Sequence, residues 1–112
     1  MEDACIRSGN LFAGVPSDLP GELVEEVLQG RGFRLERIVS RGHRSPDDFW
    51  YDQPLSEWVV LLTGSASLRF ENRSEPIEMK PGDWIHIPAH ARHRIERTDA
   101  KGDTFWLALH HE

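Results

Sequence analysis

From residue 33 onward, short stretches of alternating apolar and polar residues are separated by residues that favour turns. FRLERIVS, SASLRFE and HRIERT show the alternation, and the turn sequences NRSE, KPGD and DAKGD stand between such stretches. Successive side chains of a β-strand point to opposite faces, so this pattern predicts strands rather than helices. Several short strands at this spacing are typical of an antiparallel sandwich or barrel. The sequence therefore predicts an all-β protein.

The stretch EWVVLLTG, residues 57–64, differs from the other predicted strands because both of its faces are apolar. Val59 and Leu61 share one face, and Val60 and Leu62 share the other. A strand with two apolar faces is covered on both sides. We expect this strand to lie deep inside the sandwich or barrel.

The first thirty residues follow other patterns. Residues 1–20 combine several glycines and prolines with few apolar positions, which predicts an irregular N-terminal arm. In residues 22–28, ELVEEVL, the apolar positions have the spacing of one helix face, and Pro20 and Gly30 bracket the segment as start and stop signals. The pattern favours one short helix here, with a strand as the alternative.

Length and charge limit the classes of function. A chain of 112 residues has room for one domain with one modest core, so we expect a single domain over residues 1–112. The formal net charge of -6 gives a long-range field that repels phosphate backbones and anionic membrane surfaces. We expect neither nucleic acid nor a membrane as a partner.

The single cysteine, Cys5, has no partner for an internal disulfide. The longest apolar stretch is WVVLL, far short of the roughly 20 residues that span a membrane. These features predict a soluble protein of a reducing compartment, the cytoplasm.

Two groups of residues carry a recognisable spacing. Gly64 follows Glu57 by seven residues, and the segment GDWIHIPAHARH brings Gly82, Pro88 and His93 together. These spacings resemble the two motifs of the cupin superfamily. The resemblance covers residues 33–109 and implies a double-stranded β-helix, a jelly-roll barrel, with a short N-terminal arm and at most one short helix.

The resemblance also implies a site at the mouth of the barrel. Side chains that begin two different strands can both point into the mouth, and Glu57 and His93 occupy the matching positions. Carboxylate oxygen and imidazole nitrogen suit a divalent transition metal such as iron, manganese, nickel or zinc. Such an ion is the cofactor that the resemblance implies.

The chain departs from the first cupin motif where a His-x-His pair precedes the glutamate. A three-residue spacing before Glu57 places Tyr51 and Gln53 there, and a four-residue spacing places Trp50 and Asp52 there. Phenol and amide oxygens ligate metals less strongly than neutral imidazole does. Asp52 is the stronger ligand, but its partner Trp50 has no lone pair to give. A metal site here would be rich in oxygen and weak.

The second motif departs from the pattern at His90, which stands where cupins usually have glycine. His90 and His93 form an HxxH pair that could bind one ion, and the alternative is a solvated histidine at a turn. The predicted metal ligands are Glu57, His93, Gln53 and Tyr51, with Asp52 and His90 as alternatives.

Three classes of function remain. The favoured one is a small binding protein that holds a divalent metal, a small molecule or both in the barrel mouth, because oxygen chemistry needs a firmly held metal and the histidine pair is missing. The alternative is a metal-dependent enzyme of the dioxygenase, isomerase or decarboxylase class at the same site. The third is an interaction module with a filled barrel, which Glu57 and His93 disfavour. The expected partners are a small-molecule ligand and a second copy of the chain.

Overall fold

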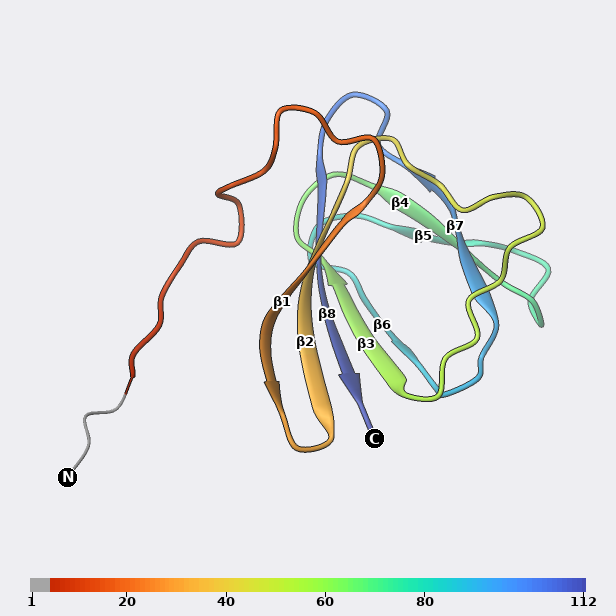
Figure 1. Cartoon of the computed structure of the whole chain (residues 1–112). Helices are drawn as coiled ribbons and strands as arrows, with labels where there is room; N and C mark the ends of the chain where they lie inside the picture. The colour runs from red at the N-terminus through yellow and green to blue at the C-terminus, as the bar shows by residue number, and fades with distance from the viewer. Residues whose placement is uncertain (1–4) are drawn as a thin grey trace.

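The computed structural model describes residues 5–112. This part of the chain contains strands and no helix (Figure 1), so it also offers no helix long and apolar enough to cross a membrane. The all-β prediction is confirmed. The eight strands are β1 (Leu23–Gly30), β2 (Phe33–Ser40), β3 (Ser56–Leu61), β4 (Ala66–Phe70), β5 (Ile77–Met79), β6 (Trp84–Ile87), β7 (His93–Thr98) and β8 (Thr104–His111).

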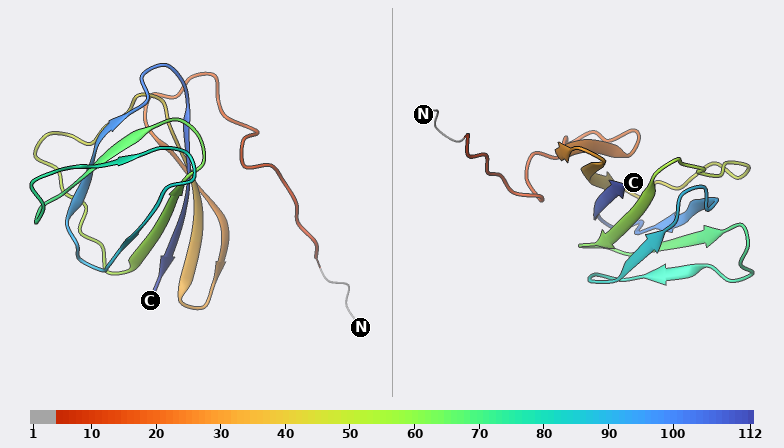
Figure 2. Two further views of the ribbon diagram at one scale, coloured as in Figure 1. Left: turned by 180° about the vertical axis from the view of Figure 1, so that it is seen from behind. Right: turned by 90° about the horizontal axis from the view of Figure 1, so that it is seen from below.

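The strands form two antiparallel sheets. The larger has the order β1-β2-β8-β3-β6 and the smaller has the order β5-β4-β7. The sheets face each other as the two walls of a barrel (Figure 2). Their facing side chains form the core, in which Leu61 of β3, Leu68 of β4 and Trp106 of β8 are buried. Each such side chain stabilises the fold by about 2 kcal/mol through removal of apolar surface from water. The double-stranded β-helix prediction is confirmed.

The segment predicted as a short helix is strand β1, so the helix prediction is wrong and its strand alternative is right. β1 pairs with β2, and the register shifts between Glu26 and Leu28, which makes Val27 the extra residue of a bulge. The bulge changes which face the later residues occupy. Apolar side chains three and four residues apart therefore arise from an irregular edge strand, on which Val24 and Leu28 remain about half exposed.

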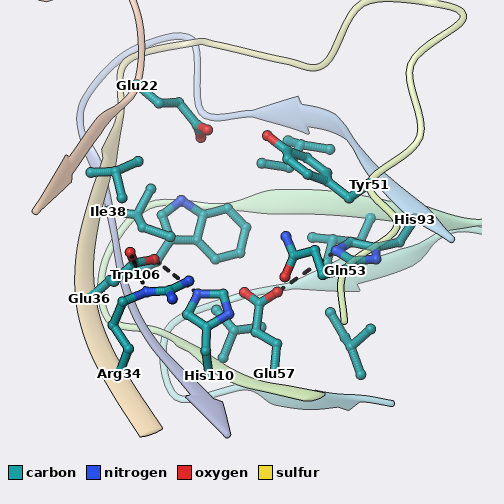
Figure 3. A pocket seen from close by; sticks show the side chains of 15 residues that line it. Glu22, Arg34, Glu36, Ile38, Tyr51, Gln53, Glu57, His93, Trp106 and His110 are labelled. Carbon is teal, nitrogen blue, oxygen red and sulfur yellow. Dashed lines mark hydrogen bonds and ion pairs between the residues drawn. The ribbon is translucent and has the colours of Figure 1, made fainter. Parts of the chain in front are cut away.

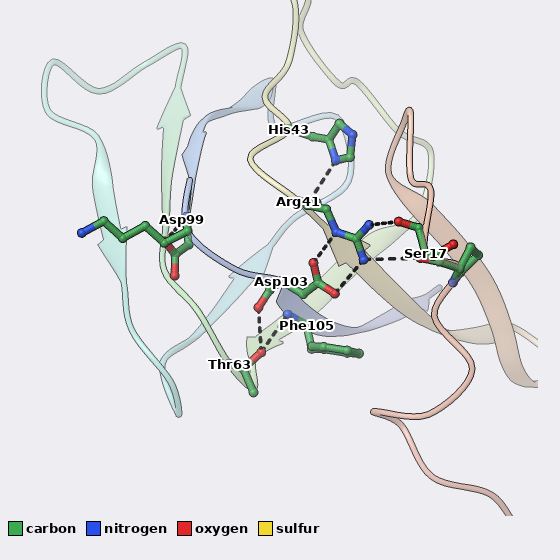
Figure 4. A network of polar contacts seen from close by, with 9 residues as sticks. Ser17, Arg41, His43, Thr63, Asp99, Asp103 and Phe105 are labelled. Atoms are coloured by element: carbon green, nitrogen blue, oxygen red, sulfur yellow. Dashed lines mark hydrogen bonds and ion pairs between the residues drawn. The ribbon is translucent and has the colours of Figure 1, made fainter.

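The N-terminal arm extends away from the barrel (Figure 1), and two arginines hold the part nearer β1: Arg37 donates to the carbonyl oxygens of Leu11 and Ala13, and Arg41 binds the arm closer to β1. Arg41 donates hydrogen bonds to the carbonyl oxygens of Ser17 and Pro16 and pairs with Asp103 at 2.7 Å (Figure 4). The Arg41 guanidinium lowers the pKa of Asp103, which keeps the pair charged. The contact fixes the arm against the loop that precedes β8.

Gly64 explains why the first motif requires glycine at this spacing. Its φ is +82°, a conformation that side chains disfavour, and an added Cβ would lie 2.9 Å from the Cα of Thr104. The close approach lets the chain turn from β3 into β4 beside the start of β8. Gly82, the first glycine of the second motif, has φ +95° but nothing within 4 Å of an added Cβ.

These two glycines provide a matched pair of variants. We expect Gly64→Ala to lower the free energy of unfolding by about 2 kcal/mol or more, because the new methyl group meets backbone as well as an unfavourable φ. Gly82→Ala incurs only the unfavourable φ and should cost about 1 kcal/mol. Urea unfolding of both variants measures the difference, and equal losses would contradict the proposed crowding at Gly64.

Candidate functional site

A row of side chains crosses the inner face of the larger sheet. The strand register places Arg34 of β2 opposite His110 of β8, His110 opposite Glu57 of β3, and Glu57 opposite Ile87 of β6. Residues directly opposite one another in antiparallel strands point to the same face. All four side chains therefore point between the two sheets (Figure 3).

A cavity of about 230 Å³ lies above this row, between the two sheets. The smaller sheet supplies part of its wall, and the segment before β3 covers it from the side of β7 (Figure 3). Its lining is Glu22, Val24, Arg34, Glu36, Ile38, Tyr51, Gln53, Glu57, Val59, Leu68, Ile87, His93, Ile95, Trp106 and His110.

Glu57 lies on the floor of the cavity and is only 8% exposed. Burial raises its pKa from the usual 4.5 to about 7, since a charged carboxylate loses its hydration inside the barrel. The negative charges of Glu36 and Glu22 act in the same direction, and the positive charge of Arg34 opposes them. Near neutral pH, Glu57 therefore exists in both its neutral and its charged form.

His93 is held rigidly beside Glu57. Its ring is stacked between the rings of Tyr51 and Phe70, with centroids 5.4 and 5.7 Å away. Its Nδ1 lies 2.8 Å from the carbonyl oxygen of Ala91, which can only accept, so Nδ1 carries the hydrogen. Nε2 then faces Glu57 with a lone pair, 3.9 Å from Oε1. Burial lowers the pKa of His93, so this contact is not an ion pair near neutral pH.

His110 lies on the other side of Glu57 and belongs to a buried polar group. Its Nε2 is 2.9 Å from one carboxylate oxygen of Glu36, whose other oxygen accepts a hydrogen bond from Arg34 at 3.0 Å. Burial lowers the pKa of His110, chiefly by removing the ring from water. Its Nδ1 is the one buried side-chain nitrogen or oxygen without a hydrogen-bond partner in residues 5–112.

The structure brings together the principal predicted site residues and separates the alternatives from them. Asp52 and His90 lie outside the cavity, where they are paired with each other at 2.8 Å and largely exposed. His90 has φ +65°, which explains why cupins usually have glycine at this position. Of the predicted site residues, Glu57, His93, Gln53 and Tyr51 line the cavity.

Backbone pairing decides which of the two spacings before Glu57 faces the cavity. Tyr51 forms an antiparallel bridge with His93, with backbone N–H to O distances of 2.7 and 3.2 Å. Alternation then places Gln53 on the same side as Tyr51 and directs Asp52 outward. The three-residue spacing is therefore the one that contributes to the cavity.

Four polar residues of the cavity were not predicted as site residues: Glu22, Arg34, Glu36 and His110. For His110, alternation along β8 does carry a signal, because it shares a face with Ala108 and Trp106, which are buried. Arg34 and Glu36 look from the sequence like the polar positions of an ordinary strand. Only the pairing of β2 with β8 shows that they face inward.

The residues present do not form a complete transition-metal site. Glu57 and His93 supply two donors, but residues 5–112 contain no group of three His, Cys, Asp or Glu side chains placed to hold one ion. Figure 3 shows the Tyr51 hydroxyl directed away from Glu57. Metal binding by Glu57 and His93, completed by Gln53 or Tyr51, stays a prediction, and no reaction step is derived from it.

The fold and the cavity define a small barrel of the double-stranded β-helix type, and known proteins agree. A crystal structure from Ralstonia eutropha JMP134, provisionally named a mannose-6-phosphate isomerase, is 47% identical. It superposes with a TM-score of 0.91 over 95% of this chain and 98% of that one. An RmlC-like cupin from Methanocaldococcus jannaschii, 18% identical, shares the fold with a TM-score of 0.66 over 88% and 86% of the two chains. The chain belongs to the cupin superfamily.

Curated sequences give a more distant likeness. A 3-hydroxyanthranilate 3,4-dioxygenase of Paraburkholderia phytofirmans is 30% identical over 78 residues, which are 68% of this chain. The chain spans about 43% of the length of that relative. No protein-family model matches the sequence.

The burial of Glu57 predicts a dependence of stability on pH. The carboxyl group has a pKa of about 7 in the folded state and 4.5 when unfolded, so the folded state binds the proton more tightly. Relative to high pH, this proton stabilises the folded state, and the effect is complete below pH 4.5. This contribution, about 3 kcal/mol, is lost as the pH rises to 7. Glutamine does not titrate, so Glu57→Gln does not lose this stability, and we expect the variant to gain relative to the wild type by up to that amount between pH 4.5 and 8.

Urea unfolding at a series of pH values measures this difference. The buried histidines titrate in both proteins, so the comparison removes most of their contribution. Glu75→Gln, which replaces an exposed carboxyl outside the cavity, serves as the control and should follow the wild type. A constant difference between Glu57→Gln and the wild type at every pH would contradict the burial effect.

Proposed function

We propose that this cupin binds a small organic molecule in the cavity between its two sheets. The observation that carries the proposal is the convergence of buried polar groups on a cavity that side chains leave open. At about 230 Å³ the cavity is smaller than the roughly 300 Å³ at which pockets for drug-sized ligands begin. The ligand is therefore a small metabolite or a small part of a larger molecule.

The lining is divided by polarity in the way that orients a ligand. Polar groups of Arg34, Glu57 and His110 lie along the floor, and aliphatic side chains with the indole of Trp106 form the walls. Apolar walls remove surface from water and so supply affinity, while a few fixed polar groups select the orientation. The apolar part of the lining is Val24, Ile38, Val59, Leu68, Ile87, Ile95 and Trp106.

Blocking the cavity tests the proposal. Val24 lies at its edge on β1 and Leu28 lies on the same strand outside it, and the two are 52% and 48% exposed. We expect Val24→Trp to weaken binding of the ligand at least tenfold because the indole enters the cavity. Leu28→Trp, the matched control, should bind as the wild type does.

The experiment is an NMR screen of the wild type with small amines, alcohols, sugars, carboxylates and sugar phosphates. Each compound that binds is titrated into both variants. The absence of any compound that perturbs the signals of cavity residues would overturn the proposal, as would equal binding by Val24→Trp and Leu28→Trp.

A metal-dependent enzyme is the second candidate function. It is supported by the adjacency of Glu57 and His93 and by the likeness to proteins named 3-hydroxyanthranilate 3,4-dioxygenase. The incomplete donor set counts against it, since metal catalysis needs a firmly held ion with an open position. The binding proposal does not require an ion.

Elemental analysis of protein purified without chelator or affinity-tag nickel separates these two candidates. The enzyme reading predicts about one divalent ion per chain, lost in the double variant Glu57→Gln with His93→Ala. An outer pair, His86 and His111, whose Nε2 atoms are 3.0 Å apart, could hold surface metal, so His86→Ala is the control. Substoichiometric metal that the double variant leaves unchanged would reject the metal site.

A further inference from the structure

The two histidines of the cavity both present lone pairs to it. The carboxylate of Glu36 can only accept, so the hydrogen of the His110 ring lies on Nε2, and Nδ1 is left as an acceptor. In His93 the opposite tautomer results, because Nδ1 donates to the Ala91 carbonyl and Nε2 is left as the acceptor. Two imidazole lone pairs therefore flank Glu57 (Figure 3).

The acceptor of His110 stands out because it is unused. The side chain is 6% exposed, and its Nδ1 has no partner in the described residues, although a buried polar atom without a hydrogen bond costs about 1 to 3 kcal/mol. The ring lines the cavity. A ligand that donates a hydrogen bond there would recover this free energy.

Part of the hydrogen-bond donor capacity of the cavity lining is already used within the protein. The Nε hydrogen of Arg34 is donated to Glu36, and the Nε1 hydrogen of Trp106 is donated to Ser40 at 3.1 Å. Among the lining side chains, this leaves the terminal N–H groups of Arg34, the amide of Gln53 and the hydroxyl of Tyr51 as donors.

The charge of the lining points the same way. Three carboxyl groups face the cavity, from Glu22, Glu36 and Glu57, against the single guanidinium of Arg34, which is paired with Glu36. A phosphate or carboxylate would meet this negative field, and the charge of the one cation is already balanced by Glu36. An ammonium group is attracted by the field, and the face of the Trp106 indole adds a favourable surface for a cation.

We propose that the ligand of this cavity is a small organic cation, whose ammonium hydrogens are accepted by His110 Nδ1, His93 Nε2 and the Glu57 carboxyl group. The inference rests on the proposed function and specifies its ligand class. The ligand class also differs from the substrate in the name of the relative from Ralstonia eutropha. The phosphate of mannose 6-phosphate would meet a guanidinium whose charge is already balanced by Glu36.

Pairs of compounds with the same shape test the ligand class. D-Glucosamine is compared with D-glucose, isobutylamine with isobutanol, and D-mannose 6-phosphate with D-mannose, each by NMR titration. We expect amines among the binders of the screen and at least tenfold tighter binding of an amine than of its matched alcohol, with no binding of the phosphate. Binding only of neutral or anionic compounds would overturn the cation but leave the proposed function standing, and no binding by any compound of the screen would overturn both.

The histidine itself is tested by substitution and by spectroscopy. We expect His110→Phe to weaken binding of the amine at least tenfold, whereas His86→Phe, on the outer face, should leave it unchanged. NMR of the wild type with isotope-labelled histidine reads the tautomers directly and needs no variant to fold. Hydrogen on Nε2 of His110 and on Nδ1 of His93 supports the inference, and hydrogen on Nδ1 of His110 would overturn it.

Discussion

Strand β8 is the element on which both the barrel and the site depend. It pairs with β2 along one edge and with β3 along the other, so that His110 lies between Arg34 and Glu57. A slip of one residue in either pairing would turn the side chains of the slipped strand to the opposite face. The buried core residues Trp106 and Ala108 share the inward face of β8 and therefore fix the register that places His110 in the cavity.

The parts of the fold that are encoded locally could be predicted from the sequence. Alternation and turn residues are short-range signals, and they identified most strands and the all-β class. Glu57 and His93 were found because their distances from Gly64 and Gly82 are also local. β1 was the exception, since the bulge at Val27 gives an edge strand the apolar spacing of a helix.

The rest of the site depends on long-range register, which no local pattern carries. Glu36 and His110 are 74 residues apart, and their contact follows only from the pairing of β2 with β8. The same holds for Tyr51 and Gln53, whose inward direction is set by the bridge from Tyr51 to His93. From the sequence, Asp52 remained an alternative to Tyr51 and Gln53 as a neighbour of Glu57.

The polar floor of the cavity lowers the stability of the fold, and this cost indicates that the polar groups serve binding rather than folding. A buried carboxyl group and an unpaired imidazole nitrogen both weaken the folded state, and apolar residues at the same positions would remove the penalty. An interaction module with a filled barrel has no need of such groups. Their unsatisfied hydrogen-bonding capacity lies beside the cavity, so a bound donor would offset the cost of both. Binding and the loss of stability are then two consequences of one arrangement of residues around Glu57.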